Sequence, residues 1–355
     1  MESMGINGAI GGGTEFAPAS TYLNTAVCGL LPRRAIEAVC ALAAENGAGR
    51  AGGPGDFEVV DAVRAAFARL VSVAPGRVAV GTSVAVHAGL IAASLPAGSE
   101  VLLPEGEFAS IVNPFVVRGD LKVRYAPLDG LAEAMAPTTA LVSFSCVQSA
   151  DGRTADLAAI RAAAAAHGAR TLLDATQAVG WLPVDAGAYD YTVTGAFKWL
   201  LCPRGVSFLT VREETQESLV PLHGGWLASA DGWHSTYGPL TELAPDARRF
   251  DEPAPFLAYH GAAAALTLVE ETGIGAIHAH DTALAARYRA GLAHLGHAPV
   301  PGTTPIVSVP GLAERAPELA RAGILTSARA GLLRATFHLY NTEADVDRLL
   351  DVLSG

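Results

Sequence analysis

Short apolar runs alternate with amphipathic stretches through the first two thirds of the chain. The runs are rich in β-branched residues and too short for buried helices, so they predict strands. Strands that are apolar on both faces and alternate with helices indicate a largely parallel sheet covered on both sides. The predicted strands are Val78–Val80, Val101–Leu103, Val123–Tyr125, Leu141–Phe144, Thr171–Leu173, Tyr191–Val193 and Val206–Val211. Between them we predict helices at Ser83–Leu95, Phe108–Val117 and Thr154–His167. The fold class is therefore α/β, with a seven-stranded, mainly parallel sheet in a large domain.

The segments on either side of this alternation give the domain organisation. A Gly-rich start and an extended stretch precede a helix opened by Pro32, and a second helix, Phe57–Val71, follows a Gly-rich loop at Asn46–Gly55. Residues 221–255 break the alternation, and the length of this segment favours a functional or interface loop. Helices at Phe256–Glu271 and Ile274–Leu295 and an αβ unit with a strand at Leu332–Phe337 come last. We predict an N-terminal arm (1–32), a large domain (33–245) and a small α+β C-terminal domain (246–355).

Charge and cysteine content narrow the class of function. The formal net charge of −11 argues against a nucleic-acid groove or an anionic membrane surface as partner. The four cysteines are far apart and form no C-x-x-C pair, so we expect neither a disulfide framework nor a metal site. We see no signal peptide and no apolar run long enough to cross a bilayer. The expected location is the cytoplasm.

A single lysine lies between the last two predicted strands. Lys198 is the only lysine within 70 residues on either side, and its neighbours Phe197 and Trp199 are bulky and apolar. A lysine on a turn between buried strands loses solvation, which lowers its pKa and makes the amine a nucleophile toward carbonyls.

Two more polar features follow predicted strands, at the edge where open α/β sheets bind ligands. Thr82 and Ser83 open a helix and could bind phosphate, although both residue types are also ordinary N-caps. Asp174 ends an apolar strand, where it could be an N-cap or the ion-pair partner of Lys198. Together the three features favour a cofactor with a phosphate, a protonatable ring nitrogen and an aldehyde. Pyridoxal 5′-phosphate has all three.

The chain resembles the class V aminotransferase family of fold-type I pyridoxal-phosphate enzymes, which includes cysteine desulfurases, kynureninase and isopenicillin N epimerase-like proteins. The matching segments occur in the family's order along essentially the whole chain. They are Tyr22-Leu-Asn, Gly81-Thr-Ser, Glu107-Phe108, Leu173-Asp-Ala-Thr-Gln177, Phe197-Lys-Trp-Leu-Leu-Cys-Pro-Arg-Gly205, Leu333-Arg-Ala-Thr-Phe-His-Leu-Tyr-Asn-Thr342 and Asp345-Val-Asp347.

The resemblance implies a role for each matched residue. Lys198 would form the Schiff base with the cofactor and then move protons at the substrate α-carbon, while Asp174 would hold the proton on the ring nitrogen. Gln177 would hydrogen-bond the phenolic oxygen, and Phe108 would stack on the cofactor. Arg334 would bind the substrate α-carboxylate, and Gln148 could also reach the substrate. The phosphate would be bound by Thr82 and Ser83, with Thr194 in place of the family's serine, because Gly195 and Ala196 precede Lys198.

Two departures from the family pattern change what we expect of the reaction and of the phosphate site. No cysteine follows Cys202, so the mobile nucleophile of a cysteine desulfurase is missing. Asp251-Glu-Pro-Ala-Pro255 replaces a Gly-Thr motif that crosses to the partner subunit's phosphate, so we expect a phosphate site built differently.

The overall similarity to actinobacterial C–S lyases and lincosamide-pathway enzymes favours two reactions on an S-conjugated cysteine in secondary metabolism. These are C–S cleavage by β-elimination and decarboxylation coupled to deamination. An aminotransferase or epimerase is the alternative, and a non-catalytic binding protein is disfavoured by the retained Lys198, Asp174, Gln177 and Arg334. The expected partners are a small amino-acid substrate and a second copy of the chain, in a homodimer.

Overall fold

The computed structural model describes residue 10, residues 15–50 and residues 55–355. Most of the Gly-rich start of the predicted arm and residues 51–54 of the predicted Gly-rich loop lie outside the described residues.

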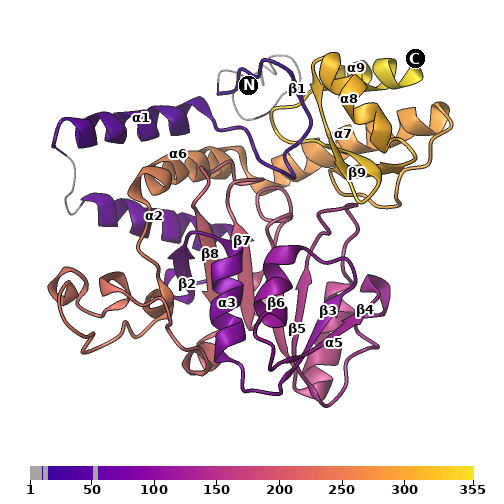
Figure 1. Ribbon diagram of the computed structural model, residues 1–355. Coiled ribbons are helices and arrows are strands. Elements are labelled where there is room, and N and C mark those ends of the chain that lie inside the picture. The colour runs from indigo at the N-terminus through magenta and orange to yellow at the C-terminus, as the bar shows by residue number, and fades with distance from the viewer. Residues whose placement is uncertain (1–9, 11–14, 51–54) are drawn as a thin grey trace.

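The seven predicted strands form one sheet, as expected (Figure 1). Their order across the sheet is β2-β8-β7-β6-β5-β3-β4. All neighbouring pairs are parallel except the two made by β8, which runs antiparallel to both β7 and β2. The chain between β7 and β8 is too short for a crossover, so β8 returns beside β7 in the opposite direction. The bounds are β2 (Val78–Gly81), β3 (Glu100–Pro104), β4 (Lys122–Ala126), β5 (Thr139–Ser145), β6 (Arg170–Asp174), β7 (Tyr191–Gly195) and β8 (Ser207–Val211).

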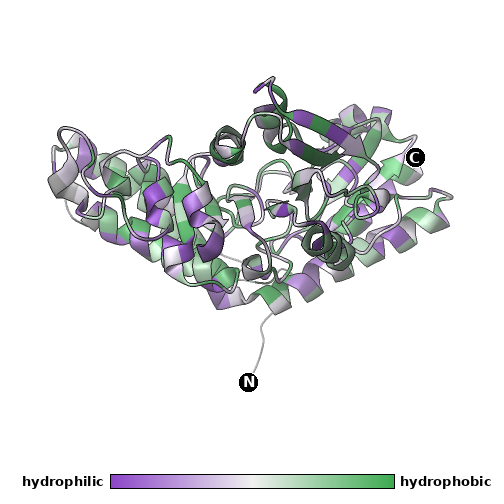
Figure 2. Ribbon diagram, turned by 90° about the horizontal axis from the view of Figure 1, so that it is seen from below, coloured by the Kyte–Doolittle hydropathy of each residue, from purple (hydrophilic) through white to green (hydrophobic). Residues whose placement is uncertain are grey.

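Alternate residues of these strands enter two different cores, as the period of two of a β-strand requires. On β3, Leu102 faces a core shared with α2 (Gly55–Leu70), α5 (Leu157–His167) and α6 (Phe256–Thr272). Its neighbours Val101 and Leu103 face a second core with α3 (Val84–Ser94) and α4 (Asn113–Val116). Figure 2 shows helices that carry hydrophilic and hydrophobic residues side by side, as expected of helices with one buried face.

The helix predicted over Phe108–Val117 is the clearest local error of the sequence analysis. The segment forms a 3₁₀ turn at Ala109–Ile111, and α4 begins only at Asn113. Pro114 has no N–H, so a helix that began at Phe108 could not be continued through it.

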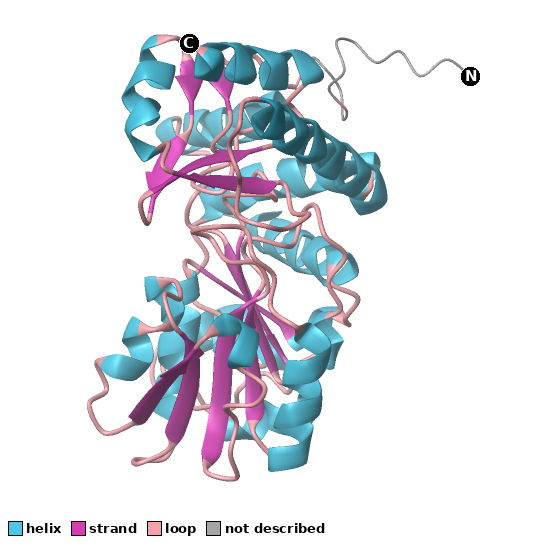
Figure 3. Ribbon diagram, turned by 90° about the vertical axis from the view of Figure 1, so that its right-hand side faces the viewer, coloured by secondary structure: helices cyan, strands magenta, loops and turns pink. Residues whose placement is uncertain are grey.

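The C-terminal part has a core of its own at one end of the molecule (Figure 3). A three-stranded antiparallel sheet in the order β11-β12-β9 packs with three helices, and a further strand, β10, pairs with β1. Leu23 of the arm is buried in this core, whereas α6 packs on α1 (Arg33–Gly47) and α2. The boundary near residue 245 stays a prediction. The bounds are β1 (Thr21–Tyr22), α7 (Ile274–His294), β9 (Ile306–Pro310), α8 (Ala316–Arg321), β10 (Ile324–Leu325), β11 (Ser327–Arg329), β12 (Leu332–Thr336) and α9 (Glu343–Ser354).

Across the described part of the chain, no helix is both long and apolar enough to cross a membrane.

Candidate active site

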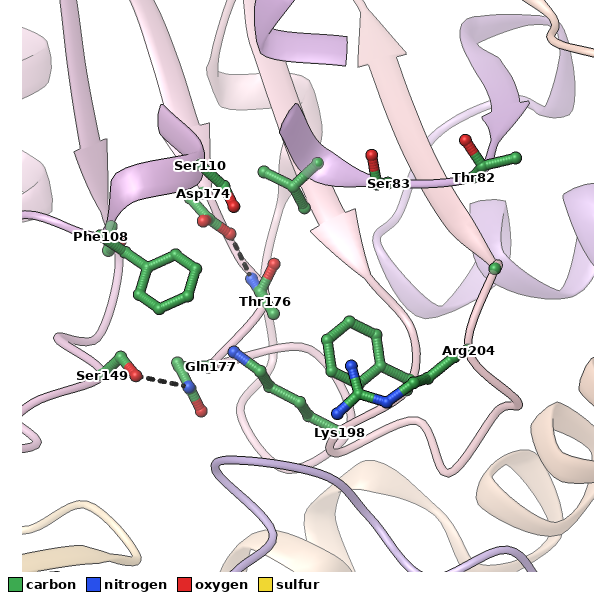
Figure 4. Close-up of a pocket in the computed structure, with 14 residues that line it drawn as sticks. Thr82, Ser83, Phe108, Ser110, Ser149, Asp174, Thr176, Gln177, Lys198 and Arg204 are labelled. Atoms are coloured by element: carbon green, nitrogen blue, oxygen red, sulfur yellow. Dashed lines mark hydrogen bonds between the residues drawn. The ribbon is translucent and has the colours of Figure 1, made fainter. Parts of the chain in front are cut away.

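A cavity of about 320 Å³ opens where the carboxyl ends of the parallel strands meet the start of α3 (Figure 4). Ligands bind at this edge in open α/β folds because the loops that follow the strands converge there. Six of the nine residues predicted for the site line the cavity. These six are Thr82, Ser83, Phe108, Asp174, Gln177 and Lys198.

Lys198 lies on the loop between β7 and β8 and is only 6 % exposed. Its Nζ lies 5.1 Å from the centre of the Phe108 ring and 5.7 Å from that of Phe197. Burial lowers the pKa of this amine from 10.5 to about 8, against the opposing effect of Asp174. The neutral fraction of the amine near physiological pH is therefore far larger than that of an ordinary lysine, and the neutral form is the nucleophile.

A close backbone approach holds the lysine loop in place. The N–H of Gly29, in the arm, donates to the carbonyl of Phe197 at 2.9 Å. A Cβ on Gly29 would lie 2.1 Å from the carbonyl oxygen of Lys198, so no larger residue fits there.

Asp174 ends β6 and is buried beside the cavity. Its Oδ1 accepts the backbone N–H of Thr176 at 2.8 Å. Burial raises the pKa of this carboxyl, while hydrogen bonds from Thr176 and the charge of Lys198 oppose the rise. A buried carboxylate of this kind is stabilised by a cationic N–H donor in the cavity, which a protonated pyridine nitrogen would supply.

Three hydrogen bonds hold the side chain of Gln177. Its Nε2 donates to the carbonyl of Ala26 at 3.0 Å and to Ser149 Oγ at 3.1 Å. Its Oε1 accepts the indole N–H of Trp199 at 2.7 Å. The amide is thus ordered by partners from three separate segments.

Arg334, on β12, is 1 % exposed and lies behind Ser149, outside the cavity lining. Its Nη1 donates to the backbone carbonyl and hydroxyl of Ser149, and its Nε donates to Ser327 Oγ at 3.2 Å. Burial, and then the charge of Arg329, lowers the pKa of this guanidinium to about 10. Its Nη2 is buried with no hydrogen-bond partner among the described residues, and a buried cationic donor of this kind fits an anionic ligand.

Two other predicted residues also lie outside the lining. Gln148 is not part of the lining, and its Nε2 donates to Glu107 Oε2 at 2.8 Å. Thr194 is buried inside β7, and its hydroxyl has no partner among the described residues. Their roles in binding stay predictions.

The start of α3 carries two kinds of hydrogen bond. Ser83 Oγ accepts the N–H of Val86 at 3.4 Å, so this serine is the N-cap of α3. The N–H and hydroxyl of Thr82 donate to Glu252 Oε2 at 2.6 and 2.7 Å. A carboxylate from the segment that replaces the family's Gly-Thr motif therefore sits on the predicted phosphate site.

Sequence analysis missed several residues of the lining. Ser149 directly follows the predicted Gln148 and joins Gln177 to Arg334. Thr176 accepts the N–H of Gly195 and places a hydroxyl in the cavity wall. Arg204 stacks on Phe197, 4.4 Å from the ring centre, and its guanidinium points into the cavity (Figure 4). Arg204 is a cationic residue two positions after Cys202 and just before β8. This position could have marked it as a site residue from the sequence.

The cavity fits pyridoxal phosphate at its ring and aldehyde positions. The amine of Lys198, whose pKa is lowered, matches the aldehyde. The buried carboxylate of Asp174 matches the ring nitrogen, and the ordered amide of Gln177 matches the phenolic oxygen. The described residues hold no cluster of metal-ligating side chains.

Comparison with known proteins shows the family of the chain. The family model for aminotransferase class-V matches residues 59–349. Isopenicillin N epimerase from Streptomyces clavuligerus is 30% identical over 95% of each chain, and an uncharacterized aminotransferase, YcbU, from Bacillus subtilis is 27% identical over 84% of each. Among solved structures, the cystine C–S lyase C-DES, in complex with cysteine persulfide, has a TM-score of 0.85 and 25% identity and covers 95% of this chain and 97% of its own. The fold is fold-type I, the cofactor is pyridoxal 5′-phosphate, and the chain belongs to the aminotransferase class-V family.

Proposed function

We propose that this protein is an enzyme that acts at the α-carbon of an amino acid and cleaves the C–S bond of an S-conjugated cysteine by β-elimination. The observation that carries the proposal is the position of Lys198. Its amine, with a pKa of about 8, lies in a cavity that has a buried carboxylate in its lining and a buried guanidinium behind Ser149.

Each of these side chains has a task that its environment supports. Arg334 would bind the α-carboxylate once its hydrogen bonds to Ser149 are broken, because the planar guanidinium group matches a carboxylate. Lys198 would hold the cofactor at its aldehyde carbon, and the released amine would take the α-proton. Asp174 would keep a proton on the ring nitrogen, and Gln177 would donate to the phenolic oxygen. Pyridoxal phosphate, when bound, supplies an acceptor for the electrons left at the α-carbon.

One observation supports elimination at sulfur over desulfuration. The similar proteins include both a cystine C–S lyase and cysteine desulfurases, so they do not decide between the two reactions. The chain has no cysteine after Cys202, so it lacks the nucleophile that a desulfurase carries before the arginine. Decarboxylation coupled to oxidative deamination of a similar substrate would use the same side chains, with molecular oxygen as the two-electron oxidant.

The alternative is an aminotransferase or an epimerase of the same family. The isopenicillin N epimerases match 95% of the chain, and none of the contacts in the cavity discriminates between fates of the α-carbon. The natural-product role, the homodimer and the cytoplasmic location stay predictions.

Product analysis separates these reactions. The purified protein should be yellow, and borohydride should remove the colour and fix a pyridoxyl group on Lys198, which Lys198→Ala abolishes. Incubated with cysteine S-conjugates, a C–S lyase releases pyruvate, ammonia and a thiol. Carbon dioxide and an aldehyde would indicate decarboxylation, and pyridoxamine phosphate accumulating without a keto acid would indicate transamination. A protein that stays colourless after cofactor is added contradicts the enzyme proposal as a whole.

A further inference from the structure

The orientation of the Gln177 amide is determined by Trp199 at its oxygen and by Ala26 at its nitrogen. An indole N–H can only donate a hydrogen bond, so the atom that faces it at 2.7 Å must be the amide oxygen. Nε2 therefore points the other way. One of its N–H groups donates to the carbonyl of Ala26 and the other to Ser149 Oγ, in the cavity lining (Figure 4). A bound phenolic oxygen would replace Ser149 Oγ as the acceptor of this second N–H.

Trp199 is itself held from the C-terminal core. Its side chain is fully buried, and its backbone carbonyl accepts a hydrogen bond from His338 Nε2 at 3.0 Å. The other ring nitrogen of His338 bonds to Asp281 Oδ2 at 2.8 Å, and both of these side chains are 0 % exposed. The His338 ring also packs edge-on against Trp199, with 5.1 Å between ring centres. The indole that orients Gln177 is thus fixed both through its backbone and through its ring.

We propose that Trp199 is a positioning residue whose indole N–H locks the Gln177 amide so that it offers N–H, and not C=O, to the phenolic oxygen of the cofactor. The inference rests on the proposed contact between Gln177 and that oxygen. A donor stabilises negative charge on the phenolic oxygen, whereas an amide turned by 180° would place an acceptor against it. Without the indole N–H, of the three partners of this amide only the carbonyl of Ala26 still favours the same orientation, because the hydroxyl of Ser149 can donate or accept.

The chain offers a matched control in a second buried tryptophan. Trp181 is 2 % exposed, and its ring centre lies 5.9 Å from that of Trp199. Its indole N–H also donates to Gln177 at 2.7 Å, but to the backbone carbonyl and not to the amide. Replacing either tryptophan by phenylalanine removes one indole N–H from the same core, and only Trp199→Phe removes a hydrogen bond from the side-chain amide.

The test is the pH at which the visible absorbance of the bound cofactor changes, measured on holoenzyme. When the phenolic oxygen loses its hydrogen-bond donor, the bound cofactor holds the proton beside that oxygen more tightly. Trp199→Phe should therefore raise the pH at which the absorbance changes by about one unit. It should also weaken cofactor binding about tenfold. Trp181→Phe should lower thermal stability to a similar extent and leave the spectral midpoint at the wild-type value.

Gln177→Leu separates failure of this inference from failure of the premise. If Gln177→Leu raises the midpoint and a folded Trp199→Phe does not, the role of Trp199 is wrong and that of Gln177 stands. If neither variant moves the midpoint, the contact of Gln177 and the inference both fail, while the yellow colour and the borohydride reaction still test the proposed function. Should Trp199→Phe not fold, benzothienylalanine at position 199 replaces the N–H by sulfur in the same shape and is subject to the same criterion.

Discussion

The two walls of the cavity are built in different ways. The inner wall, which we define as Asp174, Gln177 and Lys198, is buried. Its carboxylate accepts the N–H of Thr176, its amide is held by distant segments of the chain, and its amine lies over the Phe108 ring. The outer wall, defined as Thr82, Ser83 and Arg204, is partly or fully exposed. There the nearest carboxylate, Glu252, binds Thr82, and Arg204 has a stacking contact with Phe197.

This difference follows from the cost of burying polar groups. A buried charge or amide must be paired when the chain folds, so the inner wall is ordered before any ligand arrives. Exposed groups can be satisfied by water and can exchange it for a ligand at little cost. We therefore expect changes in the inner wall to affect the chemistry, and changes in the outer wall to affect mainly affinity.

The strongest test of this contrast is Asp174→Asn. The amide keeps the size of the side chain but cannot stabilise a proton on the ring nitrogen, so kcat should fall roughly 10²–10⁴-fold even with saturating cofactor. Asp190→Asn is the matched control, because Asp190 lies at the opposite edge of the sheet and binds Thr171. A kcat for Asp174→Asn close to that of the control would contradict the assignment of Asp174.

Two arginines, one buried and one exposed, test whether burial decides how strongly a cationic side chain contributes to ligand binding. In Arg334→Ala the buried guanidinium is lost, so the substrate dissociation constant should rise about a hundredfold while the yellow colour stays. Arg204→Ala removes an exposed cation and should weaken anionic ligands only a few-fold, less so at high salt. Both constants can be read from spectral titrations, and unchanged affinity in Arg334→Ala would refute its role.

The sequence predicted the inner wall better than the outer wall. Asp174 and Lys198 stand out because each polar residue directly follows an apolar strand, and such strands are readable from local pattern alone. Glu252 could not be found in this way, since it meets Thr82 across 170 residues of chain. From the sequence we predicted Gln148, and not its neighbour Ser149, as a residue of the site. Which of the two faces the cavity depends on the direction of the loop, which the sequence pattern does not give.

The same reasoning applies to β8 and Arg204. The apolar pattern predicts a strand after Lys198 but carries no information on its direction, which depends on the short connection from β7. Arg204 lies in that connection, so its approach to Phe197 depends on a turn that local pattern does not specify.

The pH dependence of Lys198 isolates the inner wall, if pyridoxal without its phosphate is used as the aldehyde. The folded pKa of about 8 lies below the ordinary 10.5, so the neutral amine is already dominant above pH 8. The rate of adduct formation by apo-protein should rise about tenfold per unit up to pH 8 and then level off. Lys198→Ala leaves only slow reaction at exposed sites such as Lys122. A rate that keeps rising to pH 10 would show an amine that is not desolvated.

The smallest expected effect belongs to the outer wall, at the N-cap of α3. Ser83→Ala removes the acceptor for the N–H of Val86 and should lower the free energy of unfolding of the apo-protein by about 1 kcal/mol. Asp156→Ala is the matched control, because Asp156 caps α5 through the N–H of Ala159, away from the cavity, and should cost a similar amount. Denaturant titration of both apo-proteins measures this common cost.

If Ser83 also binds the phosphate, Ser83→Ala alone should weaken cofactor binding, by up to about tenfold. Equal cofactor affinity in the two variants would mean that Ser83 only caps the helix, and the phosphate would then depend on the backbone of α3 and on Arg204.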